Sequence, residues 1–167
     1  FDQGPVIEVL ASHGVDLNLT SRFAFAQLVF HTPLHQAADR GSVQVLEALL
    51  QAQVPLDGQD EAGATALLLA SLAGHSACVT LLIAAKADLT ISDKLGRNGA
   101  HCAAEEGHEE TLEVLLEAKV DLEDRMLSEK TVAGAAIAHG QARALHVISA
   151  AGADLAAHQG RSPLLLT

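Results

Sequence analysis

The residues with the widest chemical range in this chain are its nine histidines and two cysteines. Such side chains can bind a transition metal, or act as a nucleophile and its base, where their spacing brings them together. The sequence contains no Cys-x-x-Cys, His-Glu-x-x-His or Gly-x-Ser-x-Gly motif. We therefore expect no metal and no cofactor. The acidic pairs Glu105-Glu106 and Glu109-Glu110 are interpreted as solvated surface rather than as a catalytic acid and base.

Both cysteines have a plain structural interpretation. Cys78 falls in an apolar helical stripe, and Cys102 directly follows His101. Neighbouring residues on a helix point apart, so a Cys–His catalytic pair is not expected, and a buried cysteine usually acts as a small hydrophobic residue. Two cysteines could form at most one bridge, which favours a reducing, intracellular compartment: the cytoplasm or, alternatively, the nucleus.

Composition narrows the classes of partner. Acidic residues outnumber basic ones by 21 to 10, for a formal net charge of −11, and so acidic a surface repels the phosphates of nucleic acids. Apolar residues make up 49% of the chain but aromatic residues only 2%, which predicts an aliphatic core. Residues 62–85 carry no Asp, Glu, Lys or Arg, yet Gly, Thr, Ser and His interrupt this run near a predicted turn, so no membrane span is expected.

The elements that carry these residues repeat with a period of 33. Thr32 begins the tetrapeptide Thr-Pro-Leu-His, and the aligned positions that follow are Thr65, Asn98 and Thr131. An alanine stands five residues after each aligned position and a glycine stands nine residues after it. Apolar segments with helical periodicity follow these glycines. Each unit is therefore predicted to form two short helices and a turn, and to bury its apolar stripe by stacking on its neighbours.

This pattern resembles the ankyrin repeat, most clearly in Thr32-Pro33-Leu34-His35 with Ala37-Ala38. The resemblance implies an all-α fold, an ankyrin repeat solenoid of stacked helix-turn-helix units linked by β-turn or hairpin loops. One domain would span 1–167, with an incomplete unit 1–18, an insertion 19–31, units starting near 32, 65, 98 and 131, and an incomplete unit 158–167. Because the sequence lacks an initial Met and stops within an apolar run, we expect a fragment of a longer chain, and further ankyrin repeats could adjoin both ends.

Departures from the pattern predict where the units differ in stability. Glycine at the ninth position would end each first helix in the left-handed region. Gln53, Lys86 and Lys119 occupy the corresponding position after the second helix, at a cost of about 1 kcal/mol each. The fourth unit lacks the Thr-Pro-Leu-His tetrapeptide. We expect it to be the least stable, so that hydrogen exchange should be faster over 131–156 than over 65–90.

The resemblance also assigns roles to side chains. It implies that His35 and His101 tie adjacent turns together, and that His75 and His108, in Gly-His pairs, are likewise structural. It places a concave binding face at the first-helix ends and the turn tips. The first-helix ends are Asp39, Arg40, Leu72, Ala73, Glu105, Glu106, Ala138 and His139, and the turn tips include Glu61, Ala64, Lys94, Leu95 and Arg97.

This face would be acidic near Glu105-Glu106 and apolar near Leu72-Ala73. The expected partner is another protein, through a helical or extended segment with basic and apolar residues. The alternative is that these positions are simply solvated.

The insertion 19–31 is the most individual part of the sequence, because it holds three of the four phenylalanines, Phe23, Phe25 and Phe30. Aromatic residues in an exposed finger are typical interface anchors. They could equally pack on the first unit or on sequence beyond this chain, and the sequence leaves both interpretations open.

The function predicted from these observations is a non-enzymatic protein–protein interaction module, or scaffold, that binds its partner through the concave face. The alternative is a regulatory or substrate-targeting array of a larger enzyme or channel, such as a ubiquitin-ligase adaptor, a kinase or a cation channel.

Overall fold

The computed structural model describes residues 32–124, 126, 128, 130–153 and 155. Within this part of the chain the secondary structure is helical throughout, with no strand. The helices are α2 (Pro33–Asp39), α3 (Val43–Gln51), α4 (Ala66–Leu72), α5 (Ser76–Ala84), α6 (Gly99–Glu106), α7 (Glu109–Glu117), α8 (Val132–Ala138) and α9 (Ala142–Ala150). The predicted all-α solenoid is confirmed.

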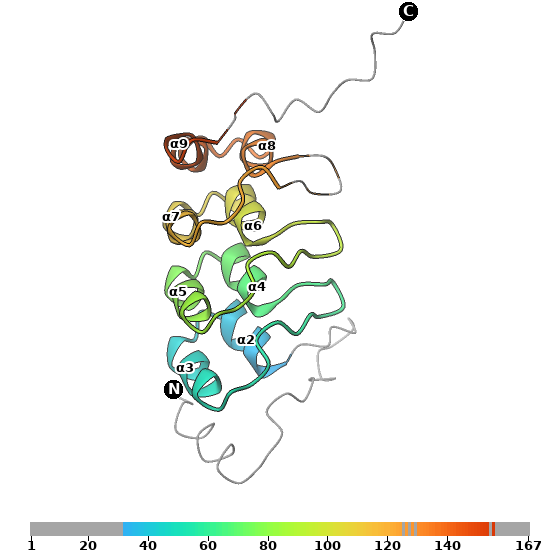
Figure 1. Cartoon of the computed structure of the whole chain (residues 1–167), viewed down its shortest axis with the longest axis vertical. Helices are drawn as coiled ribbons and strands as arrows, with labels where there is room; N and C mark the ends of the chain where they lie inside the picture. Colours follow the sequence, from blue (N-terminus) through green and yellow to red (C-terminus); the bar gives the residue numbers. More distant parts are fainter. Residues whose placement is uncertain (1–31, 125, 127, 129, 154, 156–167) are drawn as a thin grey trace, which may run out of the picture.

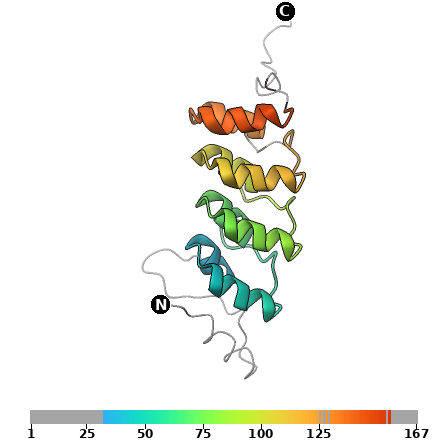
Figure 2. The same ribbon diagram turned by 90° about the vertical axis from the view of Figure 1, so that its left-hand side faces the viewer.

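The helices form two stacked layers (Figure 1). The first helices of the pairs, α2, α4, α6 and α8, pack on one another in sequence order, and the second helices α3, α5, α7 and α9 do the same. Figure 2 shows that the second helices lie nearly parallel to one another in the stack. The loops that link the pairs project beyond the layer of first helices (Figure 1).

Each first helix begins at one of the four aligned positions, which act as N-caps. The hydroxyl oxygens of Thr32, Thr65 and Thr131 each accept a hydrogen bond from the backbone N–H three residues on, at 3.3–3.4 Å. Asn98 replaces threonine in the third pair, and its Oδ1 accepts from two backbone N–H groups. Side-chain caps of this kind satisfy donors that the first turn of a helix leaves open.

Small residues allow the close stacking of the first helices. The alanines five residues after the caps are 0–3% exposed, at Ala37, Ala70, Ala103 and Ala136. On the second helices the predicted aliphatic stripe is buried, for example at Leu46 and Leu49 in α3 and at Leu112 and Leu115 in α7. One core therefore runs through all four pairs, as expected for units that cannot bury their stripe alone.

Left-handed backbone ends the helices where the sequence predicts it. The glycines after the first helices have positive φ angles, for example +74° at Gly74, where a Cβ would also lie 2.6 Å from Nδ1 of His108. Glycine is therefore required there both by backbone conformation and by close packing. Gln53, Lys86 and Lys119, with φ of 55°, 73° and 62°, adopt the same conformation without being glycine.

Several sequence predictions lie outside the described residues. These are the incomplete units 1–18 and 158–167 and the insertion with Phe23, Phe25 and Phe30. The lower stability of the fourth pair stays a prediction. Among the helices that the structure describes, none is long and apolar enough to cross a membrane.

Candidate protein-binding surface

The loops between the pairs are tight hairpins built on an aspartate. Each hairpin is numbered with the repeat whose first helix follows it, so the second precedes α4, the third precedes α6 and the fourth precedes α8. In the second hairpin, Oδ1 of Asp60 accepts from the N–H groups of Ala62 and Ala64 at 2.8 Å, and the Asp60 N–H donates to the Ala64 carbonyl. Asp93 makes the same three bonds with Leu95 and Arg97 in the third hairpin. The short polar side chain thus fixes a turn that the backbone alone would leave open.

Neighbouring hairpins are also bonded to each other. The N–H of Lys94 donates to the carbonyl of Ala62 at 2.9 Å. The side-chain amide of Gln59 donates to the carbonyls of Gly63 and Ser92, at 2.7 and 3.1 Å. These bonds hold the two hairpin tips in fixed register, so any residue at a tip is presented on a supported backbone.

Histidine side chains connect the helices to the loops, as the resemblance implied. His35 Nε2 lies 3.1 Å from the Ala64 carbonyl oxygen, and His101 Nε2 lies 3.3 Å from that of Lys130. The second pair differs, because Leu68 occupies this position and is buried against Ala64. Burial lowers the pKa of His101, although the Lys130 carbonyl and the Asp124 carboxylate oppose this effect.

A second set of hydrogen bonds links the start of a second helix to the first helix of the preceding pair. Nε2 of His75 and of His108 lie 3.0 Å from the carbonyl oxygens of Asp39 and Leu72. Gln141 takes the same place in the fourth pair and donates to the Glu105 carbonyl at 2.9 Å. The structural role expected for His75 and His108 is therefore confirmed.

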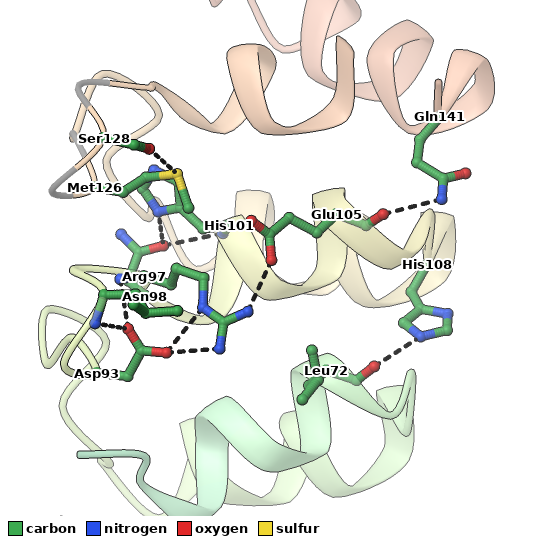
Figure 3. Close-up of polar contacts among 11 residues, drawn as sticks. Leu72, Asp93, Arg97, Asn98, His101, Glu105, His108, Met126, Ser128 and Gln141 are labelled. Atoms are coloured by element: carbon green, nitrogen blue, oxygen red, sulfur yellow. Dashed lines mark hydrogen bonds and ion pairs between the residues drawn. The ribbon is translucent and has the colours of Figure 1, made fainter. Parts of the chain in front are cut away.

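Arg97 forms the most extensive ionic contact among the described residues (Figure 3). Its guanidinium donates to Asp93 Oδ2 through Nε and Nη2, at 2.8 Å each, and to Glu105 Oε2 through Nη1 at 2.9 Å. Burial would lower the pKa of Arg97, but the bonds to Asp93 and Glu105 outweigh it and raise that pKa, so the side chain stays charged. A loop residue is thereby fastened to the end of α6.

The interpretation of Glu105 as solvated acidic surface is wrong. Glu105 is 9% exposed, and its carboxylate is paired with the guanidinium of Arg97. Ala64, expected at a turn tip, is also buried, at 8% exposure. Glu106, the next residue of α6, is exposed.

An apolar patch lies beside this ionic contact. Ala64, Leu68 and Cys102 form a small buried cluster separate from the main core, and the partly buried Leu69 and Leu72 pack against it. We call Leu69 and Leu72, with this cluster beneath them, the α4 patch. The patch joins the end of α4 to α6, and Figure 3 shows Leu72 on the helix next to the one that carries Glu105.

The remaining residues predicted for the concave face lie at other first-helix ends and on the hairpins. Those exposed at the first-helix ends are Asp39 and Arg40 at the end of α2 and Ala138 and His139 at the end of α8, while Ala73 is half-buried. Exposed hairpin residues are Glu61, Lys94 and Leu95, and Leu95, at 58%, is the most exposed large hydrophobic residue described. Opposite charges at Asp39 and Arg40 and at Glu61 and Lys94 offset each other. Near Glu105 and Glu106, where the sequence predicts an acidic region, only Glu106 presents an exposed carboxylate.

Sequence reasoning missed Leu69 as part of this surface, and it missed the contacts that the buried residues Asp93 and Cys102 make beneath it. One signal was present. The residue before the cap and the residue seven after it are Ala64 and Leu72 in the second unit but Arg97 and Glu105 in the third. Opposite charges that appear together at two repeat positions indicate a contact between them.

The cysteines offer no reactive thiol. Cys78 and Cys102 are both buried and free. Burial raises the pKa of each thiol, to about 12 for Cys102, so the nucleophilic thiolate is scarce at neutral pH. Within the part of the chain that the structure describes, no three His, Cys, Asp or Glu side chains are grouped so as to hold a metal ion.

Comparison with known proteins agrees with the architecture. A family model for ankyrin repeats in three copies matches residues 2–93, and a model for a single ankyrin repeat matches residues 96–125. Osteoclast-stimulating factor 1 of Gallus gallus is 46% identical over 50 residues, which are 30% of this chain and 25% of that protein. The Monopterus albus protein of the same name is 40% identical over 58 residues, 35% of this chain and 27% of that protein.

The chain thus spans about a quarter of the length of the curated relatives it matches. The stronger evidence is the match of the three-copy model to more than half of the chain, together with the stacked helix pairs. The chain belongs to the ankyrin repeat family, whose repeats form protein–protein interaction modules.

Proposed function

We propose that this chain is a non-enzymatic module that binds a segment of another protein on its concave surface, defined as the first-helix ends and hairpin tips of its repeats. The observation that carries the proposal is the α4 patch, where two leucines stay partly exposed above a separate apolar cluster. Apolar side chains in such a position lose water-exposed area when a partner covers them, and this supplies affinity.

The hairpins support the same proposal. Exposed Leu95 and Lys94 lie on a hairpin whose backbone is bonded to the preceding hairpin and whose base is fastened by Arg97. A preorganised surface loses little conformational entropy on binding, so more of the contact energy appears as affinity. The partner segment would place an apolar residue on the α4 patch and a basic residue near Glu106, which is exposed.

A catalytic role is not proposed. The thiols are buried, and His101, the histidine beside Cys102 in sequence, is engaged with Asn98 and the Lys130 carbonyl. The two buried free thiols also fit a reducing compartment, so we place the protein in the cytoplasm, with the nucleus as the alternative.

The test is an affinity capture from lysate of the source cells, with proteins identified by mass spectrometry. The bait with Leu72→Arg and Glu106→Lys should lose a protein that the unchanged chain recovers. A matched control bait with Glu117→Lys, an exposed change on the opposite layer, should retain that protein. Equal recovery by all three folded baits would contradict the proposal and direct attention to Phe23, Phe25 and Phe30.

A further inference from the structure

Two positions differ in chemistry from repeat to repeat while the backbone around them stays the same. The pair formed by the residue before the cap and the residue seven after it is Ala64 with Leu72 in the second repeat. In the third repeat the pair is Arg97 with Glu105. Leu72 packs against the apolar cluster that contains Ala64, whereas Arg97 and Glu105 form an ion pair at 2.9 Å.

The third pair contains a carboxylate that would be costly alone. The Glu105 side chain is 10% exposed, and the Arg97 side chain that reaches it is 22% exposed. A carboxylate removed from water to this extent requires a cationic partner. The same guanidinium also contacts Asp93 Oδ2, so one cation serves two carboxylates. Without Arg97, Glu105 would favour a Lys or Arg side chain of a protein segment bound over it.

We infer that Arg97 is a specificity-determining residue of the concave surface. By pairing with Glu105, it allows the position over the α4 patch to accept an uncharged apolar side chain, and it confines recognition of a basic residue to the exposed Glu106. This inference rests on the proposed function, because it concerns which partner segments the concave surface accepts. The occupant to which it commits is a segment of another protein with an apolar anchor beside one Lys or Arg.

The third hairpin can form without the arginine. The backbone N–H groups of Leu95 and Arg97 bond to Oδ1 of Asp93, and these groups remain after Arg97→Ala. The second hairpin makes the same bonds to Asp60 with Ala64 in the equivalent place. The double variant Arg97→Ala, Glu105→Leu therefore reproduces a pair that this fold already contains.

The experiment selects binders from a phage-displayed library of random 12-residue peptides. Parallel selections use the unchanged chain, Arg97→Ala and Arg97→Ala with Glu105→Leu. Circular dichroism and thermal melting check that each is folded, and Arg97→Met, which keeps much of the aliphatic stem, replaces Arg97→Ala if that variant does not fold. Each pool is then screened against Leu72→Arg to retain the peptides that depend on the α4 patch.

Peptides for the unchanged chain should share an apolar anchor with a single Lys or Arg. The peptides selected on Arg97→Ala should carry Lys or Arg next to the anchor about five times as often as those selected on the unchanged chain, because a partly exposed charge pair with Glu105 becomes available. The double variant should lose this enrichment and select two apolar residues. Identical consensus sequences for all three chains would overturn the inference. If no selected peptide depended on Leu72, the proposed binding at the concave surface would fail as well, and the inference with it.

Discussion

The second and third repeats show how one backbone supports two kinds of surface. Their hairpins close with matching bonds, from the Asp60 N–H to the Ala64 carbonyl at 2.9 Å and from the Asp93 N–H to the Arg97 carbonyl at 3.0 Å. Above this shared backbone, the second repeat presents the α4 patch and the third presents an ion pair. Aspartate, glycine and the capping residue therefore determine the fold, while the neighbouring positions remain open to different recognition chemistry.

The same two repeats differ at the histidine position. Leu68 packs into the apolar cluster of the second repeat, whereas His101 bonds toward the fourth hairpin. The second repeat therefore supplies no histidine to the third hairpin. Arg97 instead ties the third hairpin to α6, the helix that follows it. Each of these differences can be exchanged between repeats, so each provides a test.

The largest effect is expected from breaking the ionic contact. Arg97→Ala should lower the free energy of unfolding by about 2 kcal/mol, less than for a fully buried pair because Arg97 is partly exposed. Adding Glu105→Leu, which copies the second repeat, should restore at least half of the loss. Urea denaturation measures both, and a double variant no more stable than the single one would show that the repeats are not interchangeable here.

Alanine substitutions at the glycines after the first helices should separate the cost of backbone strain from the cost of close packing. Gly74→Ala should cost about 2 kcal/mol, because it combines a left-handed conformation with displacement of His108. Gly140→Ala has the same backbone conformation but meets no described atom within 4 Å, so its cost should be about 1 kcal/mol. Equal losses in thermal or urea unfolding would mean that the His108 contact contributes nothing.

Acidification should affect the third repeat through His101. Burial holds its pKa below the ordinary value of 6.5, so below that pH the unfolded chain binds a proton that the folded chain does not. Its contribution to stability is therefore constant above about pH 6.5 and declines as the pH falls below that value. His101→Leu, the residue of the second repeat, should flatten the difference between pH 7.5 and 5.5. An unchanged difference would exclude His101 as its source.

The smallest effect concerns the second helices. Thr111 of α7 is fully buried, and among the buried side-chain nitrogen and oxygen atoms of the described residues its hydroxyl alone has no hydrogen-bond partner. The second repeat has the buried Cys78 at the same position. Thr111→Val should raise the free energy of unfolding by about 0.5–1 kcal/mol, because it removes an unsatisfied polar group and keeps the shape. A loss of stability would show that the hydroxyl finds a partner in solution.

Sequence predicted the fold more fully than the surface because different physics governs each. The helix caps, the alanines and the glycines recur once in every unit, so a 33-residue period shows them directly. Side-chain pairing between a hairpin and a helix depends on three-dimensional contact, so the repeat period does not show that Glu105 is paired with Arg97. Leu69 was missed because its partly buried position follows from Leu68 and Cys102, which lie in different repeats.

Hydrogen exchange in the presence of a partner segment tests the central claim most directly. The chain would be measured by mass spectrometry with and without a 12-residue peptide whose binding is abolished by Leu72→Arg. Binding at the concave surface predicts slower exchange at the end of α4 and in residues 93–97, with little change in α7. Slower exchange confined to α7, with none at α4, would contradict the account.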